Sequence, residues 1–226
     1  TLAILNGLVG DHLVRSDNPL ATELGFVVDG EPRSAEEACR SLATPGRTAV
    51  VLVHGLMCTE EVFRFEDGSD YGTLLARDLG KEPLYLRYNS GLSVDENARE
   101  AEAALARLCE ERGDDLESIL LLGYSMGGLV LEGALARGIA SGAPFAAKVH
   151  GLALIGSPRG GAPLERIART ALAEVARLFD PYGPAIAHVA SARSAGIKSL
   201  GDRSSVCGGE SAPARLFVAG TLLGST

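Results

Sequence analysis

The sequence lacks the features that mark several classes of protein. No apolar run approaches the roughly 18 residues that a membrane-spanning helix needs. Lys81, Lys148 and Lys198 are the only lysines, and acidic residues outnumber basic ones by 29 to 21, which gives a formal net charge of −8. Surfaces that bind nucleic acid or anionic membranes need clustered Lys and Arg. We therefore expect neither kind of partner.

Motifs for phosphate-bearing cofactors and for metals are also missing. There is no P-loop or dinucleotide fingerprint, because Gly123, Gly127 and Gly128 do not have the spacing that such a loop requires. His54 and Cys58 stand close together in the sequence, but no further ligands cluster with them. We therefore expect no bound metal.

The cysteines and the start of the chain bear on its compartment. Four cysteines are widely spaced and form no CxxC pair: Cys39, Cys58, Cys109 and Cys207. This pattern is typical of reduced, mostly buried thiols and favours a cytoplasmic protein. No basic, apolar leader opens the sequence, but the chain starts at Thr1 rather than Met, so a removed leader and secretion stay open.

The sequence does contain an alternation of strand and helix patterns. Four helices are predicted, at about 35–43, at 71–79, from 94 toward 112, and from 126 to about 139; the first and third open on capping boxes, Ser34–Glu37 and Ser93–Glu96. Five apolar runs predict strands: Thr48–His54, Pro83–Asn89, Ser118–Leu122, His150–Ile155 and Ala214–Ala219. Such repetition implies a mainly parallel sheet with right-handed crossovers.

Residues 160–205 interrupt this alternation. Leu164–Phe179 is amphipathic, a turn follows at Asp180, and a weaker helical pattern continues to about Ala195. This is more than a crossover needs, so we expect a helical insertion that acts as a cap or lid, although its apolar side chains could simply pack on the sheet. The whole chain, 1–226, is expected to form one domain.

Ser125 is the candidate nucleophile. Residues 123–127, GYSMG, fit the pattern G-x-S-x-G and stand directly between a predicted strand and a predicted helix, as a nucleophile elbow does. So sharp a turn leaves room only for small neighbours, which explains Gly123 and Gly127. The helix N-terminus beneath the hydroxyl favours developing negative charge. The alternative is a tight strand–helix turn without chemistry.

A second motif, His54-Gly55-Leu56, follows the strand Thr48–His54. In acyl-transfer sites of this architecture, this loop and the residue after the nucleophile supply the backbone donors of an oxyanion hole. The predicted donors are the N–H groups of Leu56 and Met126. Gly55 allows close approach to the reacting carbonyl, and we expect His54 to orient the loop rather than to act as a base.

These residues resemble the α/β-hydrolase superfamily in its lipase and esterase branch. The phrases VVLVHGL (50–56) and LLLGYSMGGLV (120–130) carry the resemblance, together with YNSG (88–91) and IGSPRGGAP (155–163), in which Arg159 stands where relatives often have His. The resemblance implies an α/β-hydrolase fold, a mainly parallel sheet flanked by helices, with a helical cap and with its C-terminal part missing from this chain. It implies hydrolysis of a small carboxylic ester with an apolar acyl chain, through an acyl-enzyme on Ser125 and without a cofactor.

The resemblance also implies a triad in the order Ser, acid, His, which this sequence does not complete. Residues 220–226 contain no Asp or Glu, and no His follows His188. Acid, final strand and His are expected beyond Thr226. Alternatively, other residues are recruited as base and orienter: His188 or His150, with Asp180, Asp202 or Glu165.

Two further functions stay open. An acyltransferase or thioesterase would use the same elbow and oxyanion hole. A non-catalytic domain that binds a ligand or partner would need neither a base nor an acid. The oligomeric state cannot be read from these residues.

Overall fold

The part of the chain that the computed structural model describes comprises residues 2–42, 45–157, 195–196 and 214–218. The predicted cap lies outside these residues, apart from Ala195 and Gly196. Ala219, the loop 220–226 and the candidates Glu165, Asp180, His188 and Asp202 also lie outside them.

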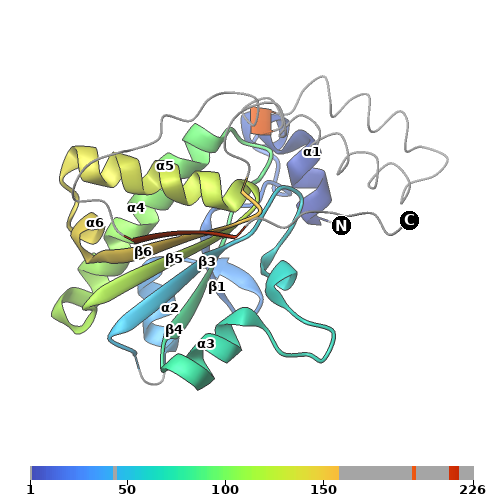
Figure 1. Ribbon diagram of the computed structural model, residues 1–226. Coiled ribbons are helices and arrows are strands. Elements are labelled where there is room, and N and C mark those ends of the chain that lie inside the picture. Colours follow the sequence, from blue (N-terminus) through green and yellow to red (C-terminus); the bar gives the residue numbers. More distant parts are fainter. Residues whose placement is uncertain (1, 43–44, 158–194, 197–213, 219–226) are drawn as a thin grey trace.

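The described strands form one sheet in the order β2-β1-β4-β3-β5-β6-β7 (Figure 1). Pairing is parallel from β4 through β3, β5 and β6 to β7, whereas β1 pairs antiparallel with β2 and with β4. The strands are β1 Gly25–Val28, β2 Glu31–Arg33, β3 Thr48–Val53, β4 Glu82–Arg87, β5 Ser118–Tyr124, β6 Val149–Ile155 and β7 Ala214–Val218. The five predicted strands and their parallel pairing are confirmed, with small differences at their ends; Tyr88 and Asn89 lie beyond β4.

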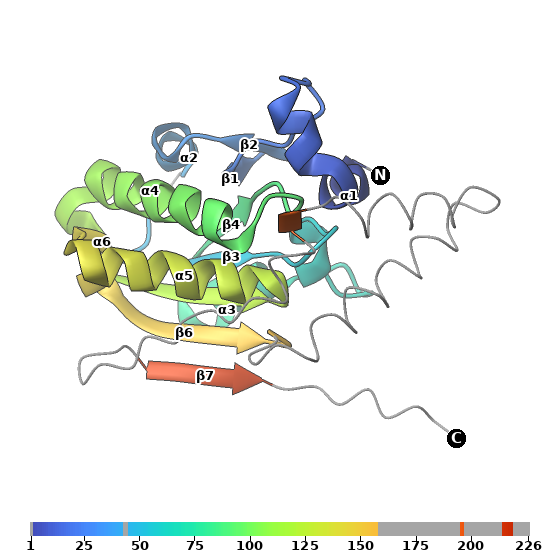
Figure 2. The ribbon, with the colours of Figure 1, turned by 90° about the horizontal axis from the view of Figure 1, so that it is seen from above.

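Helices cover both faces of this sheet. Figure 2 shows α4 and α5 side by side over one face, where α2 packs against α4, while α3 lies on the other face. The helices are α1 Leu2–Arg15, α2 Ala35–Ser41, α3 Tyr71–Leu79, α4 Val94–Arg112, α5 Met126–Ser141 and α6 Pro144–Lys148, with short 3₁₀ turns at Glu60–Phe63 and Gly113–Asp115. The four predicted helices are confirmed, and both capping boxes form.

The core lies on the two sides of β3. Its residues from Ala49 to Val53 are at most 2% exposed, as expected for an apolar run without alternation. Ala101, Leu105 and Leu108 of α4 pack against one face of the sheet. The smaller cluster on the other face contains Phe63.

The first 33 residues contain elements that the sequence patterns did not predict. Helix α1 has a kink at Val9 and contains Gly7 and Gly10, which weaken a helical pattern. The β1–β2 hairpin turns at Asp29-Gly30, where φ is 51° and 81°. Asp-Gly is a strong hairpin signal because a type I′ turn needs two positive φ angles. Helix α1 packs by Leu8 on Met57, beyond the carboxyl end of β3.

Two further properties concern partners and redox state. None of the helices in the described ranges is both long and apolar enough to cross a bilayer. Within the same ranges, Cys39, Cys58 and Cys109 are free thiols.

Candidate active site

Ser125 occupies a strained turn between β5 and α5. Its φ and ψ angles are 51° and −120°, a conformation that favours glycine. Its backbone N–H donates to the carbonyl of Ile155 on β6 at 2.8 Å. The Ser125 side chain accepts no capping hydrogen bond from a backbone N–H of α5, so its hydroxyl is not used as a helix cap.

Small residues allow the close packing around this turn. A Cβ on Gly127 would lie 2.3 Å from the Val53 carbonyl oxygen, and one on Gly123 would lie 2.3 Å from the Cα of Gly128. A Cβ on Gly55 would lie 3.1 Å from the Cβ of Ser125. The loop after β3 therefore lies directly beside Ser125, as the two motifs require.

The loop after β3 forms a tight turn from Gly55 to Cys58. The Cys58 N–H donates to the Gly55 carbonyl at 3.3 Å, and Met57 has a φ of 59°. The Met57 N–H donates to the hydroxyl of Ser90 at 3.0 Å. Within the described part of the chain, the Leu56 N–H has no acceptor. Leu56 therefore offers a free donor in this loop.

The second candidate donor belongs to Met126, the first residue of α5. The first N–H groups of a helix have no intrahelical acceptor, and the helix dipole adds partial positive charge there. No acidic side chain lies in the first turn of α5 to oppose this charge. The N-terminus of α5 is therefore suited to an anionic oxygen.

His54 is a buried, neutral residue. Its side chain stacks on Tyr88 with ring centroids 4.5 Å apart, and the residue is 1% exposed. Burial lowers its pKa from 6.5 to about 4. Nε2 accepts from the Tyr88 N–H at 3.3 Å, and Nδ1 lies 2.9 Å from the Gly55 carbonyl oxygen, to which the neutral ring donates. Since both nitrogens are engaged, the ring has none left to take a proton from Ser125.

A largely buried ion pair lies next to His54. Arg87, the last residue of β4, binds Glu60 through two hydrogen bonds, one of them 3.0 Å long from Nε to Oε2. Burial of Glu60 opposes its ionisation, but the hydrogen bonds and charge of Arg87, together with the residue's own backbone N–H, outweigh burial and lower the pKa of this carboxyl. The pair ties the 3₁₀ turn at Glu60–Phe63, which follows the Gly55–Cys58 turn, to β4.

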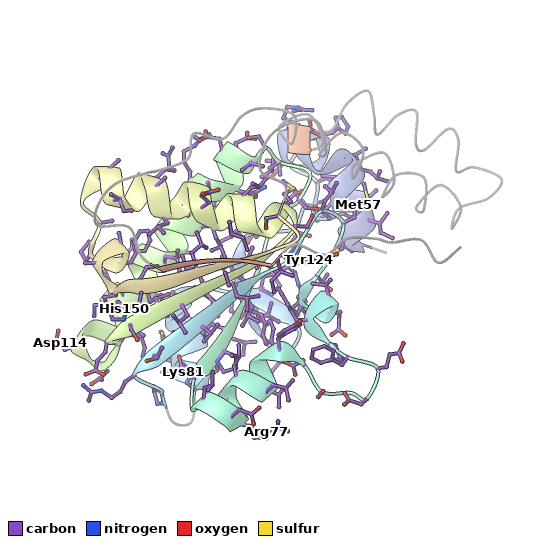
Figure 3. The ribbon with its side chains drawn as sticks, in the orientation of Figure 1. Met57, Arg77, Lys81, Asp114, Tyr124 and His150 are labelled. Carbon is purple, nitrogen blue, oxygen red and sulfur yellow. The ribbon has the colours of Figure 1, made fainter. Side chains whose placement is uncertain are left out.

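The recruitment of His150 as base is wrong. In the sheet register, Ile155 stands opposite Tyr124, and His150 lies five residues earlier on β6. At about 3.3 Å per residue this places it about 16 Å along the strand from the Ser125 turn. Figure 3 shows Tyr124 and His150 toward opposite ends of the sheet.

Three residues of this site were not singled out as site residues from the sequence: Met57, Tyr88 and Ser90. Tyr88 and Ser90 belong to the YNSG phrase, which follows β4. The carboxyl ends of neighbouring parallel strands meet at one edge of a sheet, so the position of this phrase was the available signal. No cluster of three potential metal ligands exists among the residues that the structure describes.

Comparisons with known proteins found similar solved structures. No family model and no curated protein matches the chain. The mature lipase BlEst2 of Bacillus licheniformis matches with 19% identity and a TM-score of 0.48 over 71% of this chain and 57% of the lipase. An α/β-hydrolase fold protein of Chitinophaga pinensis matches with 15% identity and a TM-score of 0.42 over 72% of this chain and 67% of its own. The NocB thioesterase domain, in covalent complex with a fluorophosphonate nocardicin G analogue, matches with 23% identity and a TM-score of 0.40 over 72% of this chain and 68% of the domain.

The chain thus spans about half the length of the mature lipase. The chain itself has three features that do not depend on these matches: a mostly parallel sheet, a strained serine between a strand and a helix, and a glycine loop that lies against that serine. These features together give the described chain the α/β-hydrolase fold.

Proposed function

We propose that this protein hydrolyses carboxylic esters through an acyl-enzyme on Ser125. The observation that carries the proposal is the conformation of Ser125, with φ of 51° between β5 and α5, next to a free backbone donor at Leu56. Backbone strain of this kind persists where the surrounding structure enforces it, and it is concentrated at functional sites.

In the first half of the reaction, the Ser125 hydroxyl oxygen attacks the ester carbonyl carbon and gives its proton to a general base. The carbonyl electrons move to oxygen, and the N–H groups of Leu56 and Met126 stabilise this oxyanion. One such donor contributes about 3 to 4 kcal/mol to transition-state stabilisation. Collapse of the intermediate breaks the bond to the alcohol, which takes the proton, and leaves the acyl group on Ser125.

In the second half, water attacks the acyl-serine ester, and the base removes its proton. The oxyanion forms again at the same donors, and its collapse releases the carboxylic acid and restores the Ser125 hydroxyl. His54 is engaged at both nitrogens, His150 lies at the other end of the sheet, and His12 is exposed on α1. We therefore assign the base to a histidine outside the described residues.

The acyl group is expected to be apolar. Leu56 and Met57 form an apolar cluster with Ile4, Leu8 and Val9 of α1, next to the proposed oxyanion hole. Each methylene that leaves water contributes up to about 0.8 kcal/mol. In a series of p-nitrophenyl esters, two additional methylenes from butanoyl to hexanoyl should therefore raise kcat/KM by up to about 15-fold.

A fluorophosphonate probe tests the nucleophile. The purified protein should be labelled at Ser125, as identified by peptide mass spectrometry, and Ser125→Ala should abolish labelling. Ser141→Ala, at the other end of α5, is the matched control and should be labelled like the wild type. A folded wild-type protein that stays unlabelled would contradict the proposal. Ester cleavage only in the presence of an acyl acceptor other than water would identify an acyltransferase instead.

A further inference from the structure

We propose that Ser90 is a positioning residue of the oxyanion hole. Its hydroxyl accepts the Met57 N–H at 3.0 Å and so anchors the turn whose first peptide, Gly55–Leu56, carries the proposed donor N–H of Leu56. The inference rests on the proposed ester hydrolysis, because it assigns a role to a residue that touches neither the substrate nor Ser125.

The turn that Ser90 holds is one that its own residues do not favour. Gly55 to Cys58 form a four-residue turn with a positive φ at its third residue, which is the type II pattern. That position normally takes glycine or asparagine, but here it is Met57, with a φ of 59°. Rotation of the Leu56–Met57 peptide would give a type I turn and a negative φ at Met57. Within the turn, the Cys58 thiol donates to the Leu56 carbonyl at 3.3 Å, and the Ser90 hydroxyl adds a contact from outside the turn on the N–H side of the same peptide.

Ser90 supplies that contact from a rigid position. The residue is 2% exposed, and it follows β4 in a turn closed by the Leu92 N–H on the Asn89 carbonyl at 3.1 Å. The side chain of Asn89 braces the same turn: its Oδ1 accepts the Gly91 N–H at 3.0 Å, and its Nδ2 donates to the Gly10 carbonyl at 3.2 Å. Helix α1 thus holds the Ser90 turn through the hydrogen bond between Asn89 and Gly10.

Packing leaves this assembly little freedom. A Cβ on Gly91 would lie 2.0 Å from the Asn6 carbonyl oxygen of α1, and one on Gly7 would lie 3.2 Å from the Met57 Cα. The backbone of α1 therefore contacts both the Ser90 turn and the oxyanion loop. Without the Ser90 hydroxyl, the buried Met57 N–H would lose its acceptor. The Leu56–Met57 peptide could then rotate about ψ of Leu56 and φ of Met57, and the turn would lose the contact that fixes the position of its preceding peptide, which carries the donor N–H of Leu56.

The test compares Ser90→Ala with two matched variants. Ser90→Thr keeps the hydroxyl. Ser118→Ala removes another buried hydroxyl, which pairs with Thr48 at 2.8 Å at the amino end of β5, far from the loop. Two quantities are measured for each folded protein: the second-order rate of fluorophosphonate labelling of Ser125, and the amide hydrogen exchange rate of Met57.

We expect Ser90→Ala to be labelled about tenfold more slowly than the wild type, which is less than the 10²- to 10³-fold effect of losing a whole oxyanion donor. For a hydrolysed ester, the loss should appear in kcat rather than in KM. The Met57 amide of Ser90→Ala should exchange at least about tenfold faster. Ser118→Ala and Ser90→Thr should retain wild-type labelling and Met57 protection.

Wild-type labelling of Ser90→Ala would overturn the inference, as would equal slowing in Ser118→Ala, which would indicate a general loss of stability. The exchange measurement separates this inference from the proposed function. If the wild type is never labelled, the hydrolase proposal fails. The role of Ser90 is then tested by the amide hydrogen exchange of Met57 alone. Unchanged exchange in Ser90→Ala overturns the positioning role, and faster exchange supports it.

Discussion

The buried, neutral state of His54 predicts that the protein loses stability in mild acid. Burial lowers the pKa of this histidine from 6.5 to about 4. Between these two values the unfolded chain binds a proton at His54 and the folded chain does not. Because the unfolded state binds more protons there, the free energy of unfolding falls as the pH falls from about 6.5 to about 4, and this contribution changes no further below that.

The magnitude follows from the size of the shift. One pKa unit corresponds to 1.36 kcal/mol, so the change from 6.5 to about 4 amounts to about 3 kcal/mol. The geometry supports the sign. A proton on Nε2 would face the Tyr88 N–H, which now donates to that nitrogen at 3.3 Å, so one of two donors would be left without an acceptor. The charges of Glu60 and Arg87 act on His54 in opposite directions and partly cancel.

Urea unfolding at pH 7, 6, 5 and 4 checks this prediction. At pH 7 we expect His54→Gln to be less stable than the wild type, because the ring stacking and the hydrogen bond to Tyr88 are lost. Between pH 7 and pH 4 the difference in unfolding free energy between the two proteins should shrink by about 3 kcal/mol, since only the wild type loses stability through protonation of His54 in the unfolded chain. His150→Gln, which removes an exposed histidine, should keep the wild-type profile. The reasoning would be refuted if the stability difference between the wild type and His54→Gln stayed constant from pH 7 to pH 4 within about 0.5 kcal/mol, the usual size of the effect of a surface substitution.

Two further predictions concern strain and buried charge. Ser125→Gly should be about 1 kcal/mol more stable than Ser125→Ala, because a left-handed φ costs a non-glycine residue about 1 to 2 kcal/mol and glycine entropy offsets part of that; equal urea midpoints would show that Ser125 is not strained. The Arg112–Glu82 pair is buried, with side chains 4% and 6% exposed. Arg112→Met should therefore cost about 3 to 5 kcal/mol in unfolding free energy, and adding Glu82→Leu should recover most of it. A single-variant loss below about 1 kcal/mol, typical of exposed pairs, would contradict this assignment.

The elements predicted from the sequence are those with strong local signals. The apolar run of β3, the capping box that opens α4, and Gly80, which ends α3 with a φ of 59°, each depend on a few neighbouring residues. The turn at Ser125 was predicted for the same reason, since strand, glycines and helix follow one another directly. Its role as nucleophile stays a prediction.

The parts of the fold and of the site that were not predicted depend on contacts between residues that are distant in sequence. Asn6 of α1 is buried because its side chain bonds Leu20 and Thr22, so a polar residue stands where a helical pattern expects an apolar one. His54 and Tyr88 are 34 residues apart in sequence and stack only because their strands are neighbours. Alternation of strands and helices does not fix which strands are neighbours, and so it could not predict these contacts.

The strand order itself explains how the loop after β3 is held. Val53, the last residue of β3, stands opposite Leu86 of β4 on one side and opposite Gly123 of β5 on the other. The loop that follows β3 therefore emerges between two segments, the Ser90 turn after β4 and the Ser125 turn after β5. One segment binds the Met57 N–H, and the other lies against Gly55. A central strand thus lets one neighbour hold the loop while the other presents Ser125. The same loop on an edge strand would have only one of these two neighbours.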